Sequence, residues 1–201
     1  MDEEKKSGLI AVIIVLVVFG SIGVIAYKMV NKDKYTYTSP SGEDFKVEKL
    51  SIGYSIRSYV GDQPYDIRLR NDPKNLENIT IEPDIKNKIL SRQTIYFTID
   101  PKENLTSIST IGAMEISNII NRRLGIFNKE TLGATTEFAN NFTEIANCNN
   151  ITKIIGVIWL KKGPETNVFS EKECVIVQGT DEWEIVRAAD RLAAQILTIM
   201  S

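Results

Sequence analysis

The sequence CVIVQGTDEWEIVRAADRLAAQILTIM, Cys174–Met200, decides the fold class of this 201-residue chain. Its apolar opening predicts a short buried strand, and Gly179 and Thr180 form the turn that follows. Asp181, with Glu184 three residues later, is a capping pair that predicts a helix, and the apolar residues beyond it recur at helical spacing to the chain end. A strand, a short turn and a helix in this order indicate an α/β fold.

A second unit of the same kind lies upstream. Residues 94–99 are β-branched and aromatic, as in a strand that ends at Asp100, and residues 105–124 carry apolar positions at near-helical spacing up to Gly125. Residues 151–160 are nearly all apolar and predict a strand buried on both faces. We therefore expect a small mixed β-sheet covered by helices, with at least one right-handed parallel crossover.

The region before these units has the alternation of an N-terminal β-hairpin. Apolar residues alternate over residues 45–56 and again over 65–69, on either side of a turn at 61–64. Residues 84–90 predict a short helix, and residues 131–138 a further strand before an Asn-rich loop. These segments complete the expected domain.

Residues 8–27 contain no charged side chain and are long enough to cross a bilayer, which needs roughly 20 apolar residues. The run is longer than the core of a secretory signal and no cleavage site follows before its end, so we interpret it as an uncleaved anchor that contacts membrane lipid through residues 8–30. The expected organisation is a cytoplasmic tail at 1–7, a transmembrane helix at 8–30, a polar stalk at 31–44 and an extracytoplasmic α/β domain at 45–201, divided into a hairpin region at 45–92 and a core at 93–201.

The composition limits the chemistry that the domain can perform. The chain has no histidine and 2 cysteines, so it lacks the commonest general base, the Ser-His and Cys-His catalytic pairs and any Cys-rich zinc site. The formal net charge is −2 and the basic residues are scattered among acidic ones, which argues against a nucleic-acid partner. We expect no catalytic residue, metal or cofactor.

Two features favour an extracellular position for the domain. The chain has two cysteines, Cys148 and Cys174, which is the number that one disulfide requires, although two unrelated buried thiols remain the alternative. Glycosylation sequons occur slightly more often than the roughly two expected by chance. They begin at Asn78, Asn104, Asn141 and Asn150. The lysines on the two sides of the apolar run do not decide its orientation.

The leader Lys5-Lys6-Ser7-Gly8, followed directly by a long apolar segment, resembles the leader of type IV pilin-like subunits of archaea and bacteria. This resemblance implies cleavage after the small residue and assembly of the helices into a filament. The Glu commonly found five residues into the helix of bacterial pilins is absent, because Val12 and Ile13 occupy that neighbourhood. A filament subunit is therefore the alternative to a simple anchor.

The turn Gly179, Thr180 and Asp181 is the candidate ligand site, because it joins a strand end to a helix N-terminus, where α/β proteins bind anions. It has a single glycine and an acidic cap that would repel phosphate, so ordinary capping is the simpler interpretation. A pair of carboxylates could instead hydrolyse a sugar bond, although no spacing rule links the candidates. These candidates are Asp100, Glu115, Glu137 and Asp181.

Charged residues at helical spacing in the last segment predict a solvated helix face with weak ion pairs. They are Glu184, Arg187, Asp190 and Arg191, and Trp183, one turn before Arg187, is expected to stack on it.

Four segments resemble small membrane-anchored proteins of unknown function found among archaea. They are Cys174–Asp181, Ala188–Leu192, Arg70–Pro73 and Ile95–Asp100. The resemblance implies an archaeal surface protein and transfers no catalytic residue. A vaguer likeness links the strand, turn and Ala-rich helix to accessory domains of glycosidases and of surface-layer proteins, at the level of fold alone.

We therefore expect a single-pass membrane protein that displays a non-catalytic α/β domain outside the cell. Its role would be structural, or the binding of another envelope or surface-layer protein. The alternatives are the filament subunit and, less favoured, an envelope hydrolase that uses carboxylates.

Overall fold

The computed structural model describes residues 16–17, 19–21, 33–123, 125–139 and 144–200. The chain divides into two compact units, residues 1–35 and 36–201. In the first unit the described residues between 16 and 21 are helical, and the apolar Leu16, Val17 and Phe19 are exposed. No helix within the described residues has the length and apolar character to cross a membrane. The tail at 1–7 and most of the predicted transmembrane helix at 8–30 lie outside the described residues.

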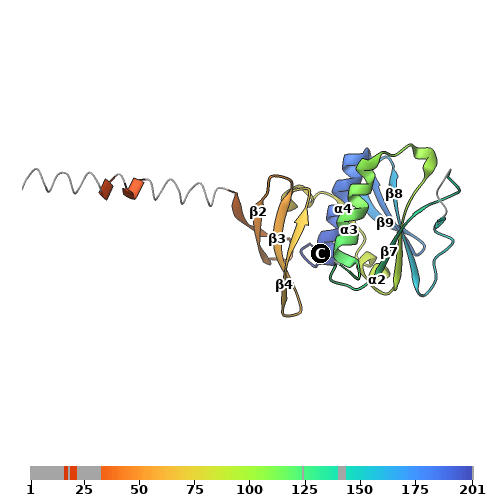
Figure 1. Cartoon of the computed structure of the whole chain (residues 1–201), viewed down its shortest axis with the longest axis horizontal. Helices are drawn as coiled ribbons and strands as arrows, with labels where there is room; N and C mark the ends of the chain where they lie inside the picture. The colour runs from red at the N-terminus through yellow and green to blue at the C-terminus, as the bar shows by residue number, and fades with distance from the viewer. Residues whose placement is uncertain (1–15, 18, 22–32, 124, 140–143, 201) are drawn as a thin grey trace, which may run out of the picture. The chain divides into compact units, whose positions relative to one another are not determined.

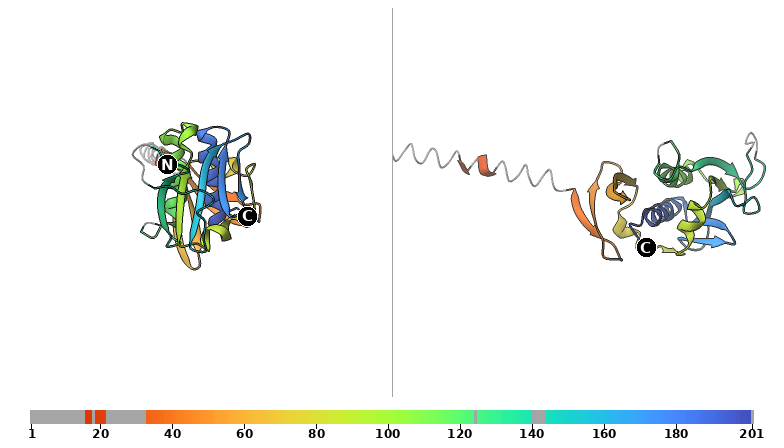
Figure 2. Two further views of the ribbon diagram at one scale, coloured as in Figure 1. Left: turned by 90° about the vertical axis from the view of Figure 1, so that its right-hand side faces the viewer. Right: turned by 90° about the horizontal axis from the view of Figure 1, so that it is seen from below.

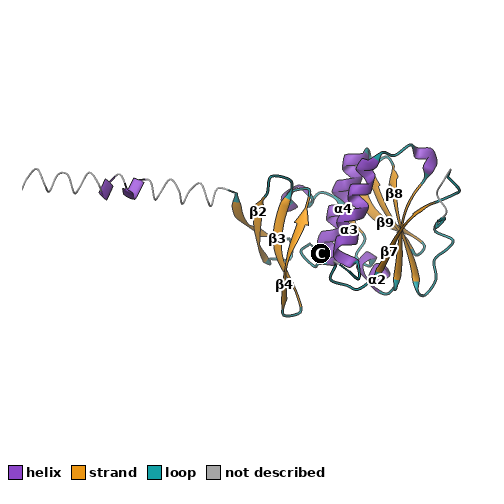
Figure 3. Ribbon diagram, in the orientation of Figure 1, coloured by secondary structure: helices purple, strands orange, loops and turns teal. Residues whose placement is uncertain are grey.

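The second unit contains two β-sheets and three α-helices among the described residues (Figure 1, Figure 3). The strands are β1 Lys34–Thr38, β2 Asp44–Lys49, β3 Tyr54–Val60, β4 Gln63–Leu69, β5 Thr80–Ile81, β6 Thr94–Ile99, β7 Glu130–Thr135, β8 Ile155–Lys162, β9 Asn167–Glu171 and β10 Cys174–Gly179. The helices are α2 Ile85–Leu90, α3 Ser107–Ile120 and α4 Glu182–Ile196, with 3-10 turns η1 Pro73–Asn75 and η2 Pro101–Glu103. The predicted α/β class is thus confirmed.

The first sheet has the strand order β1-β2-β3-β4. β3 and β4 form the predicted hairpin, antiparallel with Ile56 opposite Ile67. Its turn is shorter than expected: Val60 pairs with Gln63, so only Gly61 and Asp62 lie between the strands. Gly61 has a φ of 60°, which suits a turn that requires glycine at its first central position.

Two details of this sheet differ from the sequence predictions. Residues 45–56 form two strands, because the chain turns back at Gly53, whose φ is 80° and whose carbonyl accepts a hydrogen bond from the Leu50 N–H. The polar segment 31–44, predicted to be a stalk, contributes β1 to the sheet. Its Tyr37 is only 1% exposed and anchors the strand in the core.

The second sheet has the strand order β5-β9-β10-β8-β6-β7. β10, β8, β6 and β7 run parallel, and β9 pairs antiparallel with β10. Helix α3 therefore connects the parallel neighbours β6 and β7, which confirms the predicted mixed sheet with a parallel crossover. β9 was not predicted, because Val168 and Phe169 alone give too short an apolar signal.

Helices α3 and α4 lie between the two sheets, which Figure 1 shows from the side and the right-hand view of Figure 2 shows almost along the helix axes. They pack closely where Gly112 of α3 meets α4 and β8. A Cβ atom at Gly112 would lie 3.1 Å from Cβ of Ala189 and 3.4 Å from Cδ2 of Leu160. The helices thus form the middle of three layers, and each is covered on more than one side.

This middle position overturns one prediction about α4. Asp190 and Arg191 were expected on a solvated face, but they are 0% and 6% exposed. The segment that follows β4 covers Asp190: the backbone N–H and the Nδ2 of Asn71 both donate to its Oδ2, at 2.8 Å each. The amphipathic pattern could not reveal this second packing surface. The helix also ends at Ile196 and does not continue to the chain end.

The predicted disulfide between Cys148 and Cys174 is confirmed. Cys174 begins the central strand β10 and is fully buried, in a cluster with Ala146 and Ile176 on the face of the sheet away from the helices. The disulfide holds the described part of the Asn-rich loop on this face. The loop therefore covers this face of the second sheet, and the helices cover the opposite face.

We expect Cys148→Ser to lower the free energy of unfolding by about 3 kcal/mol, because the bond closes a loop with a sequence separation of 26 residues. Urea denaturation of the full-length chain measures the loss. Asn149→Ser, beside the cysteine on the same exposed loop, is the matched control and should change the free energy by less than about 0.5 kcal/mol. An unchanged Cys148→Ser protein would show that the bond does not stabilise the fold.

Candidate functional site

The carboxyl ends of β6, β7, β8 and β10 meet at one edge of the second sheet because these strands are parallel. In open α/β sheets this edge is where ligands usually bind. The structure brings three of the predicted site residues to it. Asp100 follows β6, Glu137 lies two residues after β7, and Asp181 lies two residues after β10.

The turn Gly179, Thr180 and Asp181 acts at this edge as a helix cap. Oδ1 of Asp181 accepts a hydrogen bond of 2.9 Å from the Glu184 N–H, so the predicted capping role is confirmed. Gly179 is required by packing. A Cβ atom there would lie 2.2 Å from the backbone nitrogen of Ile185, so only glycine allows the strand end to approach the helix this closely.

The neighbouring N-terminus of α3 is also bound by the chain's own carboxylate. Oε2 of Glu182 accepts hydrogen bonds from the N–H and Oγ1 of Thr106, at 2.9 Å each, and from the N–H of Ser109 at 3.3 Å. A helix N-terminus attracts anions because its first N–H groups lack partners within the helix. Here Asp181 and Glu182 fill both positions, which leaves a phosphate group little to bind at this edge.

The four candidate catalytic carboxylates have different partners. Asp100 accepts from the Lys102 N–H at 2.8 Å, and Glu137 forms an ion pair of 2.6 Å with Lys102 Nζ. Glu115 lies apart, in the middle of α3, and binds Nε of Arg70 at 2.8 Å. Within the described part of the chain, no group of three or more side chains is arranged to hold a metal ion. The edge thus has the contacts of a structural network.

The charged side chains of α4 that precede Asp190 are also engaged. Nη1 of Arg187 donates to Glu184 at 2.7 and 2.9 Å, which confirms the predicted pair. Nη2 of Arg187 binds the carbonyl of Asn75 and Oδ1 of Asn78. Arg187 is therefore held by η1 and the segment after it, and not by the expected stacking on Trp183, which is 57% exposed.

Three of the four predicted sequons can be placed. The side chains of Asn78, Asn104 and Asn150 are exposed, as an oligosaccharide would require. Asn104 has a left-handed backbone with a φ of 49°. Asn141 lies outside the described residues.

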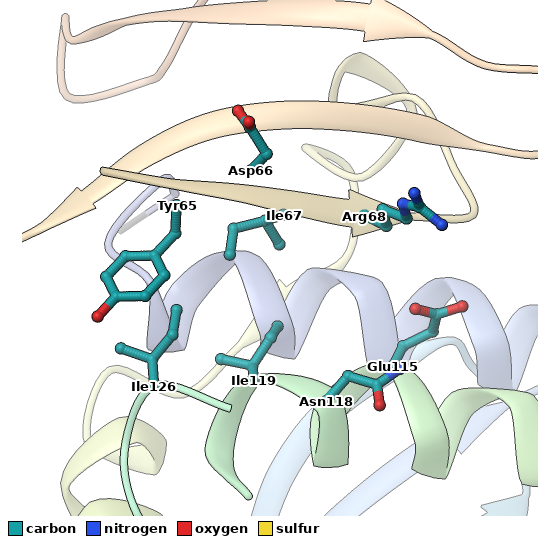
Figure 4. Close-up of a pocket in the computed structure, with 8 residues that line it drawn as sticks. All are labelled: Tyr65, Asp66, Ile67, Arg68, Glu115, Asn118, Ile119 and Ile126. Atoms are coloured by element: carbon teal, nitrogen blue, oxygen red, sulfur yellow. The ribbon is translucent and has the colours of Figure 1, made fainter. Parts of the chain in front are cut away.

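A groove lined by both polar and apolar side chains lies elsewhere, between β4 and α3 (Figure 4). It has a cavity of about 230 Å³. Its lining residues are Tyr65, Asp66, Ile67, Arg68, Glu115, Asn118, Ile119 and Ile126. This volume is below that of pockets for drug-sized ligands and suits a single side chain or one small ring.

The groove has an apolar floor and polar walls. Figure 4 shows the side chains of Tyr65 and Ile67 directed from β4 toward Ile119 and Ile126, while Asp66 points away. Asp66 is neutralised by a two-point ion pair with Arg57, at 2.8 and 2.9 Å, and Glu115 by Arg70. The sequence alternation placed Ile67 in the core, but only the strand order shows that β4 is an edge. For that reason the groove could not be predicted from the sequence.

A cluster of polar groups is buried where α4 faces the first sheet. Asp190, Arg191, Gln195 and Tyr37 are all at most 6% exposed. Burial raises the pKa of Asp190 to about 7, the hydrogen bonds from Asn71 oppose this rise, and the nearby Glu115 carboxylate adds to it. Burial also lowers the pKa of Arg191. The stability of the contact between α4 and the first sheet therefore depends on whether these groups are protonated.

No protein-family model, curated protein or solved structure matches this chain. The fold and the site define a disulfide-bonded, three-layer α/β domain with a groove at the edge of its first sheet.

Proposed function

We propose that this chain is a membrane-tethered protein whose α/β domain lies on the outer face of the membrane and has a binding or structural role at the cell envelope. The disulfide between Cys148 and Cys174 carries the proposal. Disulfides form and persist in oxidising compartments, and most are absent from the reducing cytosol. The tether is the apolar run at residues 8–27.

Three further observations support a binding or structural role. The sequons that the structure describes are exposed. The helix N-termini at the ligand-binding edge of the second sheet are bound by Asp181 and Glu182. The groove between β4 and α3 offers apolar surface with the outer edge of a strand beside it. A protein strand or small ligand fits such a surface, because the two carboxylates that line it, Asp66 and Glu115, are already paired with Arg57 and Arg70.

Intact-mass measurement of the protein taken from its native membrane, with and without reductant, tests this function. We expect a full-length chain that gains two hydrogens on reduction and carries glycan mass. Cys148→Ser is the matched control and should show no gain on reduction. Protease added to intact cells should digest residues 36–201 of the wild type.

Other outcomes would overturn the proposal. A bare full-length chain with free thiols, digested only after the cells are broken, would place the domain in the cytoplasm. A chain that begins at Leu9 would favour the filament subunit that the leader Lys5-Lys6-Ser7-Gly8 resembles.

A further inference from the structure

The outer edge of β4 carries main-chain groups that can pair with another strand. In an antiparallel hairpin with a two-residue turn, the first pair is hydrogen-bonded and the pattern alternates from there. Val60 and Gln63 are that first pair, so Gln63, Tyr65 and Ile67 bond to β3. Pro64, Asp66 and Arg68 therefore direct their main-chain groups outward. Because Pro64 has no N–H, Asp66 and Arg68 are the two residues of β4 that offer both a donor and an acceptor.

Nothing in the described part of the chain bonds to these outward groups: the backbone hydrogen bonds outside the sheets and helices include none from Asp66 or Arg68. The groove runs along this edge, because its lining includes four consecutive residues of β4, whose side chains alternate between the two faces. A strand that pairs with an edge lies about 4.8 Å from it. The groove is thus the space beside β4 that an added strand would enter.

The charges on the solvent face of β4 select the strand that fits. If a second β4 pairs antiparallel about a two-fold axis at Ile67, Asp66 lies opposite the partner's Arg68, and Arg68 lies opposite the partner's Asp66. This register also places the outward main-chain groups of Asp66 and Arg68 in hydrogen-bonded pairs. Shifting the axis to Asp66 or Arg68 would place like charges opposite each other, which is destabilising.

The same register fits the other face. Ile67 would lie beside the partner's Ile67, over the apolar floor formed by Ile119 and Ile126. On the solvent face each Asp66 would lie between Arg57 of its own chain, 2.8 Å away, and the partner's Arg68. Arg68 is exposed and has no ion pair within 4.0 Å among the described residues. The strand is therefore self-complementary in shape, main-chain bonding and charge.

We propose that two copies of this chain associate through their β4 strands, antiparallel about a two-fold axis at Ile67, so that the two four-stranded sheets join into one of eight strands. This inference rests on the binding role proposed above and is independent of the side of the membrane on which the domain lies.

Light scattering of the full-length chain in detergent micelles, combined with two charge variants, tests the interface. The wild type should be a dimer. Asp66→Arg leaves only positive charge along the edge and Arg68→Asp only negative charge, so each variant alone should self-associate at least about tenfold more weakly. Mixed in equal amounts under separate affinity tags, the two variants should co-purify as a heterodimer, because each supplies the charge that the other lacks.

Arg57→Ser is the matched control, because it removes the existing partner of Asp66 and leaves the outer edge unchanged; it should remain dimeric. The thermal midpoint of each variant reports whether it has folded, and the exposed positions 66 and 68 should tolerate the changes. A monomeric wild type would overturn the inference, and so would charge variants that dimerise as the wild type does. A mixture that fails to associate although each variant is folded and monomeric would also overturn it. None of these outcomes bears on which side of the membrane the domain lies, which the intact mass and the protease digestion of intact cells test.

Discussion

Gly179→Ala is expected to lower the free energy of unfolding by about 3 kcal/mol or more, a large fraction of the stability of a domain this size. The new Cβ would lie 2.2 Å from the nitrogen of Ile185, 2.4 Å from the carbonyl carbon of Glu184 and 2.8 Å from the oxygen of Asp181. All three are main-chain atoms of the first turn of α4, so no side-chain rotation can relieve the contact. The helix must move away from β10, which disrupts the packing of the middle layer.

Gly133→Ala is the matched control for this prediction. Gly133 lies in the edge strand β7, and a Cβ atom there would meet nothing within 4 Å. We expect this variant to be as stable as the wild type, or up to about 1 kcal/mol more stable, because alanine restricts the unfolded chain. Urea denaturation of the full-length proteins measures both. Equal stability of the two variants would mean that α4 can shift at little cost, and glycine at 179 would then need another explanation.

Asp190→Asn is expected to change how stability depends on pH. The pKa of Asp190 is about 7 in the folded chain, and a free aspartate has a pKa of about 3.9. Below about pH 4 the carboxyl is protonated in both the folded and the unfolded chain, so it does not change the free energy of unfolding. Between about pH 4 and 7 the unfolded chain ionises first, so the free energy of unfolding falls as pH rises. Above pH 7 the full cost of about 4 kcal/mol is present.

The variant removes this cost because asparagine has the same shape and no charge. The difference in unfolding free energy, variant minus wild type, should therefore increase from about pH 4 to about pH 8, by about 4 kcal/mol at most. Its amide oxygen can still accept a hydrogen bond from the Asn71 N–H, which Asp190 now binds at 2.8 Å.

Asp66→Asn provides a control of opposite sign. Arg57 holds the pKa of Asp66 below its usual range, so this carboxylate favours the folded state above its unfolded pKa and loses that effect as pH falls. Its variant should lose relative stability toward high pH. If the Asp190→Asn difference stayed flat from pH 4 to 8, the buried carboxylate would have to be stabilised in its charged form.

The buried cluster around Asp190 places polar groups of α4 inside the core. Tyr37 and Arg191 interact electrostatically in the core, and Nε2 of Gln195 donates to the carbonyl of Glu82, at positions where apolar residues would pack more easily. Buried polar groups are costly when their hydrogen bonds are incomplete. Oδ1 of Asp190, Nε of Arg191 and Oε1 of Gln195 have no hydrogen-bond partner among the described residues. The contact between α4 and the first sheet therefore contains buried polar atoms without partners, and its stability depends on the protonation of Asp190.

The sequence by itself determined the α/β class and the cap at Asp181, and it allowed a single disulfide, between Cys148 and Cys174, with two free thiols as the alternative. These features depend on neighbours along the chain or on a small choice of partners: a helix start needs one side-chain oxygen near its first N–H groups, and two cysteines allow a single pair. The strands with long apolar or alternating segments, such as β6 and β8, could also be predicted from the sequence. Periodicity reports which side of an element is apolar, and that information is local.

Only the tertiary structure decided which helices are packed on two sides and which strands lack a neighbouring strand on one edge. Asp190 and Arg191 have the spacing of a solvated face, yet both are buried, and Asn71 of the segment that follows β4 binds Asp190 from a position 119 residues away in the chain. Asp66 and Arg68 look like ordinary surface residues until the strand order leaves β4 at an edge. Strand order and layer contacts join residues more than a hundred positions apart, and no periodic pattern in one segment encodes them.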